Sequence, residues 1–314
     1  MCLDVMRLDS AYHAPVLASE VVGFLGERKR VLDCTLGGGG HSHALLSNGV
    51  ASVVGVDRDP DALAEAFQQL AAFSEQGRFT AVESNYAALD SIRWLAGASF
   101  DGIFLDLGLS SHQINTTERG FTFRPGAPLD MRMGNDAAAD AAELLNSADE
   151  GSLGSIFRDF GDERRAMRLA REIVRRRATQ PFETSDDLVG AIRGALGPTT
   201  GPNDFARLFQ AVRIAVNDEL GGLERALPAL RDRLDPDGVL VVIAYHSGED
   251  RLVKNAFRDW SSACICPPKQ PVCTCRGRPL GRTLTRRAVT ASDDEIARNP
   301  RARSARLRAW QNAA

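Results

Sequence analysis

The stretch LDCTLGGGGHSHALL, residues 32–46, decides the architecture of the chain. A short apolar segment, RVLDCTL (30–36), runs into four consecutive glycines, Gly37 to Gly40, and a helix-like pattern follows near 42–48. A glycine-rich turn between a buried strand and a helix lets a ligand approach the backbone N–H groups, because no side chain stands in the way. The pattern therefore predicts a ligand site in the first loop of an α/β fold.

Beyond this loop, apolar segments alternate with helical patterns. Residues 52–59, 78–84 and 100–108 have the length and apolar character of buried strands, and 61–73 has the spacing of an amphipathic helix. The strand pattern returns at 235–247. Strands that are apolar on both faces are typical of a parallel sheet covered by helices on both sides. We therefore predict an α/β fold of the Rossmann-like kind, with a mostly parallel sheet.

The pattern changes after the fourth predicted strand. Residues 109–134 are loop-like and rich in Gly, Pro and Thr, and helical spacing follows, as in FQAVRIAVNDEL (209–220). We expect a helical insertion, a substrate-recognition domain, at 115–210. The α/β core then consists of 1–114 and 211–314.

The basic residues are unevenly distributed, although the net charge is only −3. Only three of the 38 basic residues are lysines, and the arginines concentrate at 164–177 and 276–308. Guanidinium groups match phosphates, so these two clusters are candidate contacts for RNA or DNA. The alternative is a codon bias that places arginines on solvated helix faces.

The sequence also indicates where the protein works. No apolar run approaches the roughly 18 residues of a membrane span. Residues 1–17 carry acids and lack the apolar region of a secretory signal. We expect a cytoplasmic protein with no membrane partner.

Four of the six cysteines lie close together in CICPPKQPVCTC (264–275). Their spacing is C-x-C, six residues, then C-x-C, whereas the usual zinc knuckle is C-x-x-C. Four thiolates can bind zinc tetrahedrally, and the alternative is a set of reduced thiols in a loop stiffened by prolines. The sequence leaves both readings open for Cys264, Cys266, Cys273 and Cys275.

Two classes of ligand compete for the glycine loop. A dinucleotide loop needs G-x-G-x-x-G, and here Ser42 or His43 stands where the last glycine belongs. Asp57 ends the second strand about twenty residues after the loop, where a carboxylate accepts the two ribose hydroxyls of NAD or of S-adenosylmethionine (SAM). Asp33 lies in the first strand, and an acid there suits the ammonium of a methionine moiety better than a pyrophosphate. Together these residues favour SAM.

Polar residues at the other strand ends add to this interpretation. Asp106 ends the fourth strand and is followed by LGLSSHQ. In a SAM-binding fold, a polar residue at this position faces the methyl donor and the acceptor, and its oxygen can accept an N–H of a target amine and aim the nitrogen lone pair. Four of the five histidines also lie just beyond a predicted strand end, which favours a shared site: His41, His43, His112 and His246.

Taken together, these motifs resemble the ribosomal RNA small subunit methyltransferase H family, also called MraW. PLDMRM and HS-x-EDR are not general methyltransferase features, so the match is specific. The resemblance covers nearly the whole chain in the right order: HAPVL (13–17), DCTLGGGGHS (33–42), GVDRDPDAL (55–63), DGIFLDLGLSSHQI (101–114), RGFTFRPGAPLDMRM (119–133), GDERRAMRLAREIVRRR (161–177), FQAVRIAVNDEL (209–220), YHSGEDRLVK (245–254) and NPRARSARLR (299–308).

The resemblance implies a class I SAM-dependent methyltransferase core with a helical insertion. It implies N4-methylation of one cytosine in the decoding region of 16S rRNA, within the small ribosomal subunit. No catalytic metal is expected, because the positive sulfur already activates the methyl group. The implied SAM contacts are Gly39, Gly40, His41, Asp57, Tyr86 along the adenine, Asp106 and Gln113.

Two catalytic candidates besides Asp106 have competing interpretations. Asp130 in PLDMRM either touches the cytosine or pairs with Arg132. His246, at the end of the last parallel strand, either faces the acceptor or holds its loop together.

The chain departs from the family pattern at two places. The family usually reads FHSLEDR, and here the segment is YHSGEDR, so that Tyr245 adds a hydroxyl and Gly248 replaces a leucine. The segment GPNDFARLFQ (201–210) replaces a more usual PATRTFQ. The first change bears on the loop after the last parallel strand, and the second on the packing of the insertion.

Two other functions remain open at this point. A nicotinamide-dependent oxidoreductase would be stabilised by NAD and not by SAM. A non-catalytic RNA-binding assembly factor on a methyltransferase scaffold would bind SAM without transferring methyl groups. The sequence does not decide the oligomeric state, a homodimer included.

Overall fold

A computed structural model describes residues 15–110, 113–114, 116–267, 270, 272 and 274–314. The chain divides into two compact units. One contains the chain up to Gly108 together with Leu220–Ala314, and the other is Leu109–Glu219.

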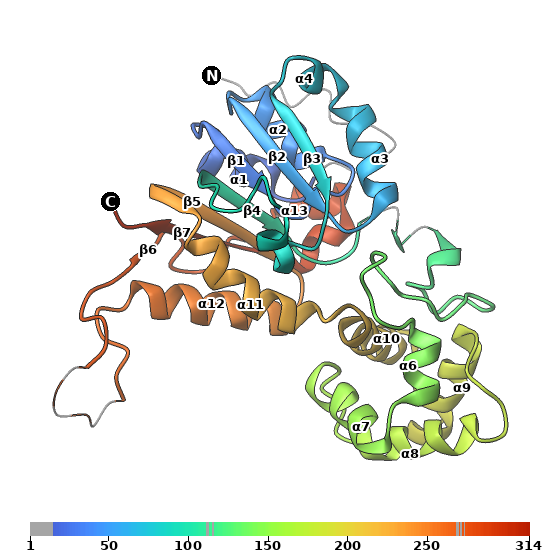
Figure 1. The fold of residues 1–314 in the computed structure, drawn as a ribbon. Coiled ribbons are helices and arrows are strands. Elements are labelled where there is room, and N and C mark those ends of the chain that lie inside the picture. Colours follow the sequence, from blue (N-terminus) through green and yellow to red (C-terminus); the bar gives the residue numbers. More distant parts are fainter. Residues whose placement is uncertain (1–14, 111–112, 115, 268–269, 271, 273) are drawn as a thin grey trace. The chain divides into compact units, whose positions relative to one another are not determined.

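The first unit is built on a seven-stranded sheet with the strand order β3-β2-β1-β4-β5-β7-β6 (Figure 1). Strands β1 to β5 run parallel, and β7 is antiparallel to both β5 and β6. This mostly parallel order confirms the predicted class I methyltransferase fold. The strands are β1 (Arg30–Asp33), β2 (Ser52–Asp57), β3 (Phe79–Glu83), β4 (Phe100–Asp106), β5 (Leu234–Ala244), β6 (Gly281–Thr283) and β7 (Arg306–Asn312).

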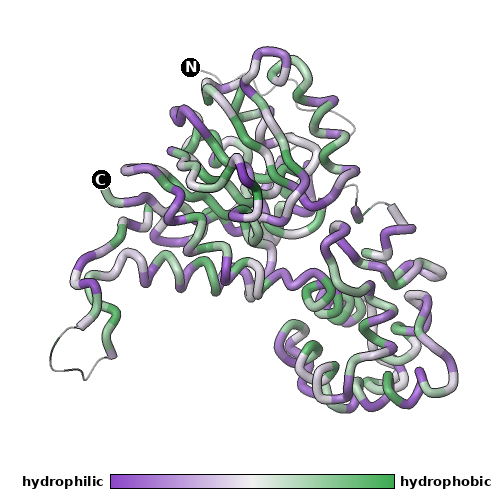
Figure 2. The backbone as a smooth tube through the Cα atoms, viewed as in Figure 1, coloured by the Kyte–Doolittle hydropathy of each residue, from purple (hydrophilic) through white to green (hydrophobic). Residues whose placement is uncertain are grey.

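The central strands are buried on both faces, because each face packs against its own set of helices. Along β4, Phe104 joins one apolar core, whereas Ile103 and Leu105 join the other. Figure 2 shows that the helices alternate between hydrophobic and hydrophilic residues along their length. Helices α1 (Ala18–Leu25), α2 (Gly40–Ser47) and α3 (Pro60–Gln69) contribute to the first core, and η1 (Tyr86–Ser91), α11 (Glu219–Arg231) and α12 (Ser247–Ser261) to the second. Shorter elements of this unit are α4 (Ala71–Glu75), α13 (Asp293–Arg298) and η3 (Pro300–Ser304).

The order of the strands indicates where on this sheet a ligand binds. From β1 the chain moves to β2 on one side, and β4 lies on the other side of β1. The strand order therefore reverses between β1 and β4. In open α/β sheets, ligands bind beyond the carboxyl ends of the strands at such a switch point.

The second unit is helical and has a core of its own. Buried residues such as Phe157, Leu169 and Ile192 pack together in it. The elements are η2 (Thr117–Arg119), α6 (Ala141–Ser147), α7 (Glu150–Asp159), α8 (Ala166–Arg177), α9 (Ser185–Leu196) and α10 (Pro202–Asn217).

The bounds of this unit differ from the predicted insertion at 115–210. The predicted end falls inside α10, which is one continuous helix of 16 residues. A compact unit does not divide within such a helix, so the unit extends to Glu219. None of the helices in the described part of the chain has the length and apolar character that a bilayer crossing requires.

Candidate active site

The glycine loop joins β1 to α2 with a backbone that only glycine adopts easily. Gly37 and Gly39 have φ angles of 52° and 87°, in the left-handed region. A Cβ on Gly39 would also lie 3.0 Å from the Leu70 side chain. Gly40 differs, because a Cβ there would meet Pro15 at an ordinary 3.6 Å. The packing of the chain therefore explains why residue 39 is glycine. It does not explain why residue 40 is glycine, and a ligand that approaches the backbone there would.

Asp57 closes this loop from the end of β2. Its Oδ2 accepts a hydrogen bond from the Gly37 N–H at 2.7 Å, and its Oδ1 accepts one from the Asp59 N–H at 2.9 Å. Burial raises the pKa of the Asp57 carboxyl to about 6, against the lowering effect of these two N–H groups. The group is thus a fixed and partly desolvated acceptor beside the glycines.

Asp33 does not have the role that the sequence suggested. Its side chain is fully buried, and it accepts a hydrogen bond from the Ser42 hydroxyl at 2.7 Å. Burial raises its pKa to about 6. A carboxylate sealed in this way ties β1 to the first turn of α2, and is not exposed to receive an ammonium group. The argument from Asp33 toward SAM was therefore wrong in its physical basis.

Three elements bring polar groups together at Asp106, the last residue of β4. Its Oδ1 accepts a hydrogen bond from the Tyr245 hydroxyl at 2.8 Å. Its Oδ2 lies 3.4 Å from Nε2 of His41, in the first turn of α2. The Asp106 N–H donates to the Thr35 hydroxyl at 2.6 Å. The carboxylate is 23% exposed, so it is oriented by the protein and still accessible.

Tyr245 acts as a donor in this arrangement. Burial, together with the negative charge of Asp106, raises the pKa of the phenol well above its usual value. The hydroxyl therefore stays protonated and donates a hydrogen bond to the carboxylate. Sequence reasoning noted only that Tyr245 adds a hydroxyl. It did not connect Tyr245 with a residue 139 positions away.

The predicted cluster of four histidines does not form. His41 lies at Asp106, but His43 packs edge-on against Phe73, with ring centroids 5.6 Å apart. Residues two apart on a helix face different directions, which explains the separation. His112 lies outside the described residues.

The His41 ring is nevertheless unusual. Among the described residues, neither of its buried ring nitrogens has a hydrogen-bond partner. Buried polar atoms without partners are rare and call for an explanation. A bound ligand beside the glycine loop and Asp106 would provide one.

His246 holds its own loop together. Its Nδ1 accepts a hydrogen bond from the Gly248 N–H at 3.2 Å and thereby caps α12. Its Nε2 lies 3.1 Å from the buried Glu249. The Oε2 of Glu249 accepts a hydrogen bond from the Tyr245 N–H at 2.8 Å. Of the two interpretations of His246, these contacts favour the architectural one.

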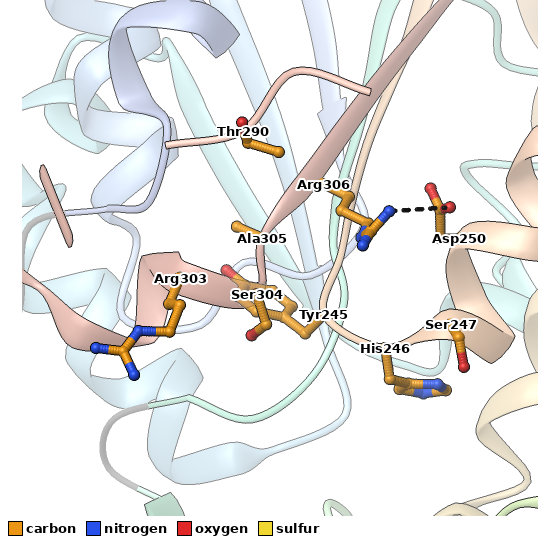
Figure 3. A pocket seen from close by; sticks show the side chains of 9 residues that line it. All are labelled: Tyr245, His246, Ser247, Asp250, Thr290, Arg303, Ser304, Ala305 and Arg306. Atoms are coloured by element: carbon orange, nitrogen blue, oxygen red, sulfur yellow. Dashed lines mark ion pairs between the residues drawn. The ribbon is translucent and has the colours of Figure 1, made fainter. Parts of the chain in front are cut away.

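A pocket of about 270 Å³ lies next to Tyr245 and His246. Figure 3 shows the side chains of Arg303 and Arg306 at this pocket, with Arg306 paired to Asp250 at 4.0 Å. Hydroxyl side chains add hydrogen-bonding groups, and the combination suits an anion such as a phosphate. The lining residues are Tyr245, His246, Ser247, Asp250, Thr290, Arg303, Ser304, Ala305 and Arg306.

Tyr86 begins η1 directly after β3, and it packs against the second apolar core. The helix start is fixed by Asn85, whose side chain accepts a hydrogen bond from the Ala87 N–H at 2.9 Å. Tyr86 therefore lies in the same unit as the glycine loop, in the segment that follows a parallel strand.

Two other predicted site residues belong to the second unit. Asp130 accepts hydrogen bonds from the Arg132 guanidinium at 2.9 and 2.7 Å. Burial raises the pKa of Asp130, but the hydrogen bonds and charge of Arg132 outweigh it and lower the pKa below its usual value. Gln113 accepts a hydrogen bond from the Ser110 N–H at 3.1 Å. Both side chains therefore make local contacts in their own loops.

The arginine cluster at 164–177 is largely used within the second unit. Glu172 pairs with both Arg175 and Arg176 at 2.7 Å, and these contacts lower its pKa to about 2. Arg177 donates to two backbone carbonyls at the end of α6. Arg165 donates to the Leu196 carbonyl and Arg171 pairs with Glu150, so five of the seven arginines have partners within the unit, which weakens the interpretation of the cluster as a nucleic-acid surface.

The chain is similar to a family of methylases along nearly its whole length. Residues 10–313 match the MraW methylase family. The chain is 65% identical to the ribosomal RNA small subunit methyltransferase H of Gemmatimonas aurantiaca, over 96% of each chain. It is 48% identical to the protein of the same name from Heliobacterium modesticaldum, over 95% of this chain and 97% of the other. Among solved structures, a methyltransferase from Streptococcus mutans in complex with SAH has 10% identity and a TM-score of 0.42, covering 94% of this chain and 96% of that one.

Proposed function

The chain belongs to the MraW methylase family, and from that premise we propose that it methylates the N4 amine of one cytosine in the decoding region of 16S rRNA. The methyl donor is SAM, and the substrate is the RNA within the small ribosomal subunit. The observation that carries the proposal is the meeting of Asp106, Tyr245 and His41 beside the glycine loop.

The residues present fit this cofactor. Asp57 is an ionisable acceptor fixed at the loop, suited to two vicinal ribose hydroxyls. The His41 ring nitrogens make no hydrogen bond within the described residues, which leaves polar groups for the methionine end beside the glycine loop. Tyr86 is the aromatic residue assigned to the adenine. The cofactor supplies a methyl group that its positive sulfur has already activated.

Asp106 performs the orienting role in this proposal. The exocyclic nitrogen of cytosine is a poor nucleophile, because its lone pair is conjugated with the ring. A carboxylate oxygen that accepts one N–H holds the nitrogen at about 3 Å and turns the lone pair toward the methyl group. The Tyr245 hydroxyl occupies Oδ1, so Oδ2, on the His41 side, is the oxygen that we assign to the amine. The proton lost after transfer goes to solvent or to a nearby acid.

The contacts with RNA are assigned to two places. The pocket with Arg303 and Arg306 adjoins Tyr245, and its charge suits a backbone phosphate. The helical unit is assigned to substrate recognition. Because Asp130 and Gln113 make local contacts there, we give them an architectural role in the loops of that unit.

The test is methyl transfer from labelled SAM to small subunits that lack the modification, followed by digestion to nucleosides. We expect the label in N4-methylcytidine. SAM binding without label in any nucleoside would favour the assembly-factor alternative. Label in another nucleoside would contradict the assigned position.

A further inference from the structure

The chain makes an excursion from the first unit between α12 and β6, at residues 262–280. In Figure 1 it extends outward beyond the ends of both elements. Its base is closed by Arg276, which donates to the backbone carbonyls of Asp259 and Ser262. The Leu280 N–H completes the closure with a hydrogen bond of 2.8 Å to the Trp260 carbonyl.

Apolar packing does little to order this excursion. Ile265 is 52% and Val272 is 70% exposed, and only Leu280, at the end of the described part of the excursion, packs against the second apolar core. Fixing a backbone costs conformational entropy, so a segment with so little apolar packing needs another source of stability. Small substructures of this kind are often held by a bound metal.

Three sulfur atoms meet inside the excursion. The Sγ atoms of Cys264, Cys266 and Cys275 all lie within 4.8 Å of one another. The Cys264 and Cys275 sulfurs are 3.8 Å apart. Two sulfurs bound to a tetrahedral zinc at about 2.3 Å would lie about 3.8 Å from each other. The spacing of the thiols therefore matches that of ligands around one ion.

Backbone N–H groups support the same interpretation. The Ile265 N–H, between the first two cysteines, donates to the Cys275 sulfur at 3.4 Å. In return, backbone N–H groups of Thr274 and Cys275 are directed at the Cys266 sulfur. Each C-x-C arm thus offers donors to a sulfur of the other arm. Such donors stabilise a thiolate, which is the form that binds metals.

We propose that Cys264, Cys266 and Cys275 bind one structural Zn²⁺ that fixes the excursion at 262–280. Soft thiolates select zinc, copper(I) or iron–sulfur clusters, and the tetrahedral spacing favours zinc. Cys264, Cys266 and Cys275 are free thiols, and the 3.8 Å between the Cys264 and Cys275 sulfurs is well beyond the roughly 2.05 Å of a disulfide bond. Cys273 lies outside the described residues, and the proposal rests on the other three. It is independent of the methyl-transfer mechanism.

The test is the metal content of the full chain, purified under reducing conditions from zinc-supplemented cells and measured by plasma mass spectrometry. We expect close to one zinc per chain. The double substitution Cys264→Ser, Cys275→Ser should reduce this at least tenfold, because it removes two of the three ligands. Cys34→Ala is the matched control: it removes a buried thiol of the sheet and should keep the zinc.

A second measurement keeps the result interpretable. The double variant should still bind SAM, which shows that the α/β core is folded. It should be cut by trypsin after Arg276 at least tenfold faster than the zinc-loaded protein. The proposal is overturned if the wild-type chain takes up no zinc, if the double variant keeps it, or if iron is found in its place.

Discussion

The carboxyl edge of the sheet and the helical unit use their polar side chains in opposite ways. In the helical unit, charged groups satisfy one another: Asp130 pairs with Arg132, and Glu172 pairs with Arg175 and Arg176. At the sheet edge, neither buried nitrogen of His41 makes a hydrogen bond in the described part of the chain, and Asp106 keeps an accessible oxygen. The difference teaches where to look for function, because satisfied polar groups stabilise a fold and incompletely satisfied ones await a ligand. Substitutions at the sheet edge should therefore change binding or rate, and those in the helical unit should change stability.

The largest expected effect is on SAM affinity at the sheet edge. Asp57→Ala removes the acceptor assigned to the ribose hydroxyls, and we expect the Kd for SAM to rise about 100-fold, as hydrogen bonds to a charged group imply. Isothermal titration calorimetry measures it. Asp61→Ala, which removes an exposed carboxylate nearby, is the control and should change the Kd less than twofold. Equal effects of the two substitutions would remove Asp57 from the cofactor site.

The next effect concerns stability in the helical unit. Arg177→Ala leaves the carbonyls of Leu145 and Ala148 without the donor that now lies 2.8 and 2.7 Å away. We expect a loss of about 1–3 kcal/mol in the free energy of unfolding, with SAM affinity unchanged. Urea denaturation measures the loss, and the exposed Arg168→Ala should cost under about 0.5 kcal/mol. A drop in SAM affinity with no loss of stability would show that Arg177 serves ligand binding and not the stability of the helical unit.

The pH dependence of SAM binding sharpens the contrast. The pKa of Asp57 is raised to about 6, and the ribose hydroxyls need its ionised form as an acceptor. Binding must therefore release a proton below pH 6, so affinity should fall about tenfold between pH 7 and pH 5. Asp57→Asn should abolish this dependence. Asp33→Asn should keep it, because Asp33 titrates near the same pH but is sealed from the loop.

A smaller effect is expected from the residue that departs from the family pattern. Tyr245→Phe removes the hydrogen bond to Asp106 Oδ1 and restores the usual family residue. A hydrogen bond to a charged group is worth about 1.5–3 kcal/mol, but this one acts on the reaction only through Asp106, so we expect the rate of methyl transfer to fall about fivefold at saturating SAM. The Kd for SAM should stay within twofold. An unchanged rate would show that the hydroxyl does not position Asp106.

The parts of the molecule that depend on local patterns were predictable from the sequence. Strand periodicity and the glycine loop gave the parallel sheet, and strand ends located Asp57 and Asp106. The errors came from properties that only packing decides. The sequence around Asp33 is the same whether its carboxylate faces a ligand or is buried against the Ser42 hydroxyl. The helical unit ends at Glu219 and not at residue 210, because α10 continues to Asn217.

Long-range pairing accounts for the rest. No local pattern links Tyr245 to Asp106 or assigns the arginines of α8 to carbonyls and Glu172. His41 and His43 both follow β1, but their side chains point in different directions because they lie two positions apart on the same helix. These contacts depend on the three-dimensional arrangement, and so composition and spacing could not distinguish them from ligand contacts.

The central claim is that Asp106 orients the target amine. Its most direct test is the single-turnover rate of Asp106→Ala, preloaded with SAM and mixed with unmodified small subunits. The account predicts a rate at least about 100-fold lower at saturating SAM, because the oxygen that accepts the N–H of the amine is lost while the cofactor loop is intact. A rate within threefold of wild type would contradict it and place the orienting group elsewhere.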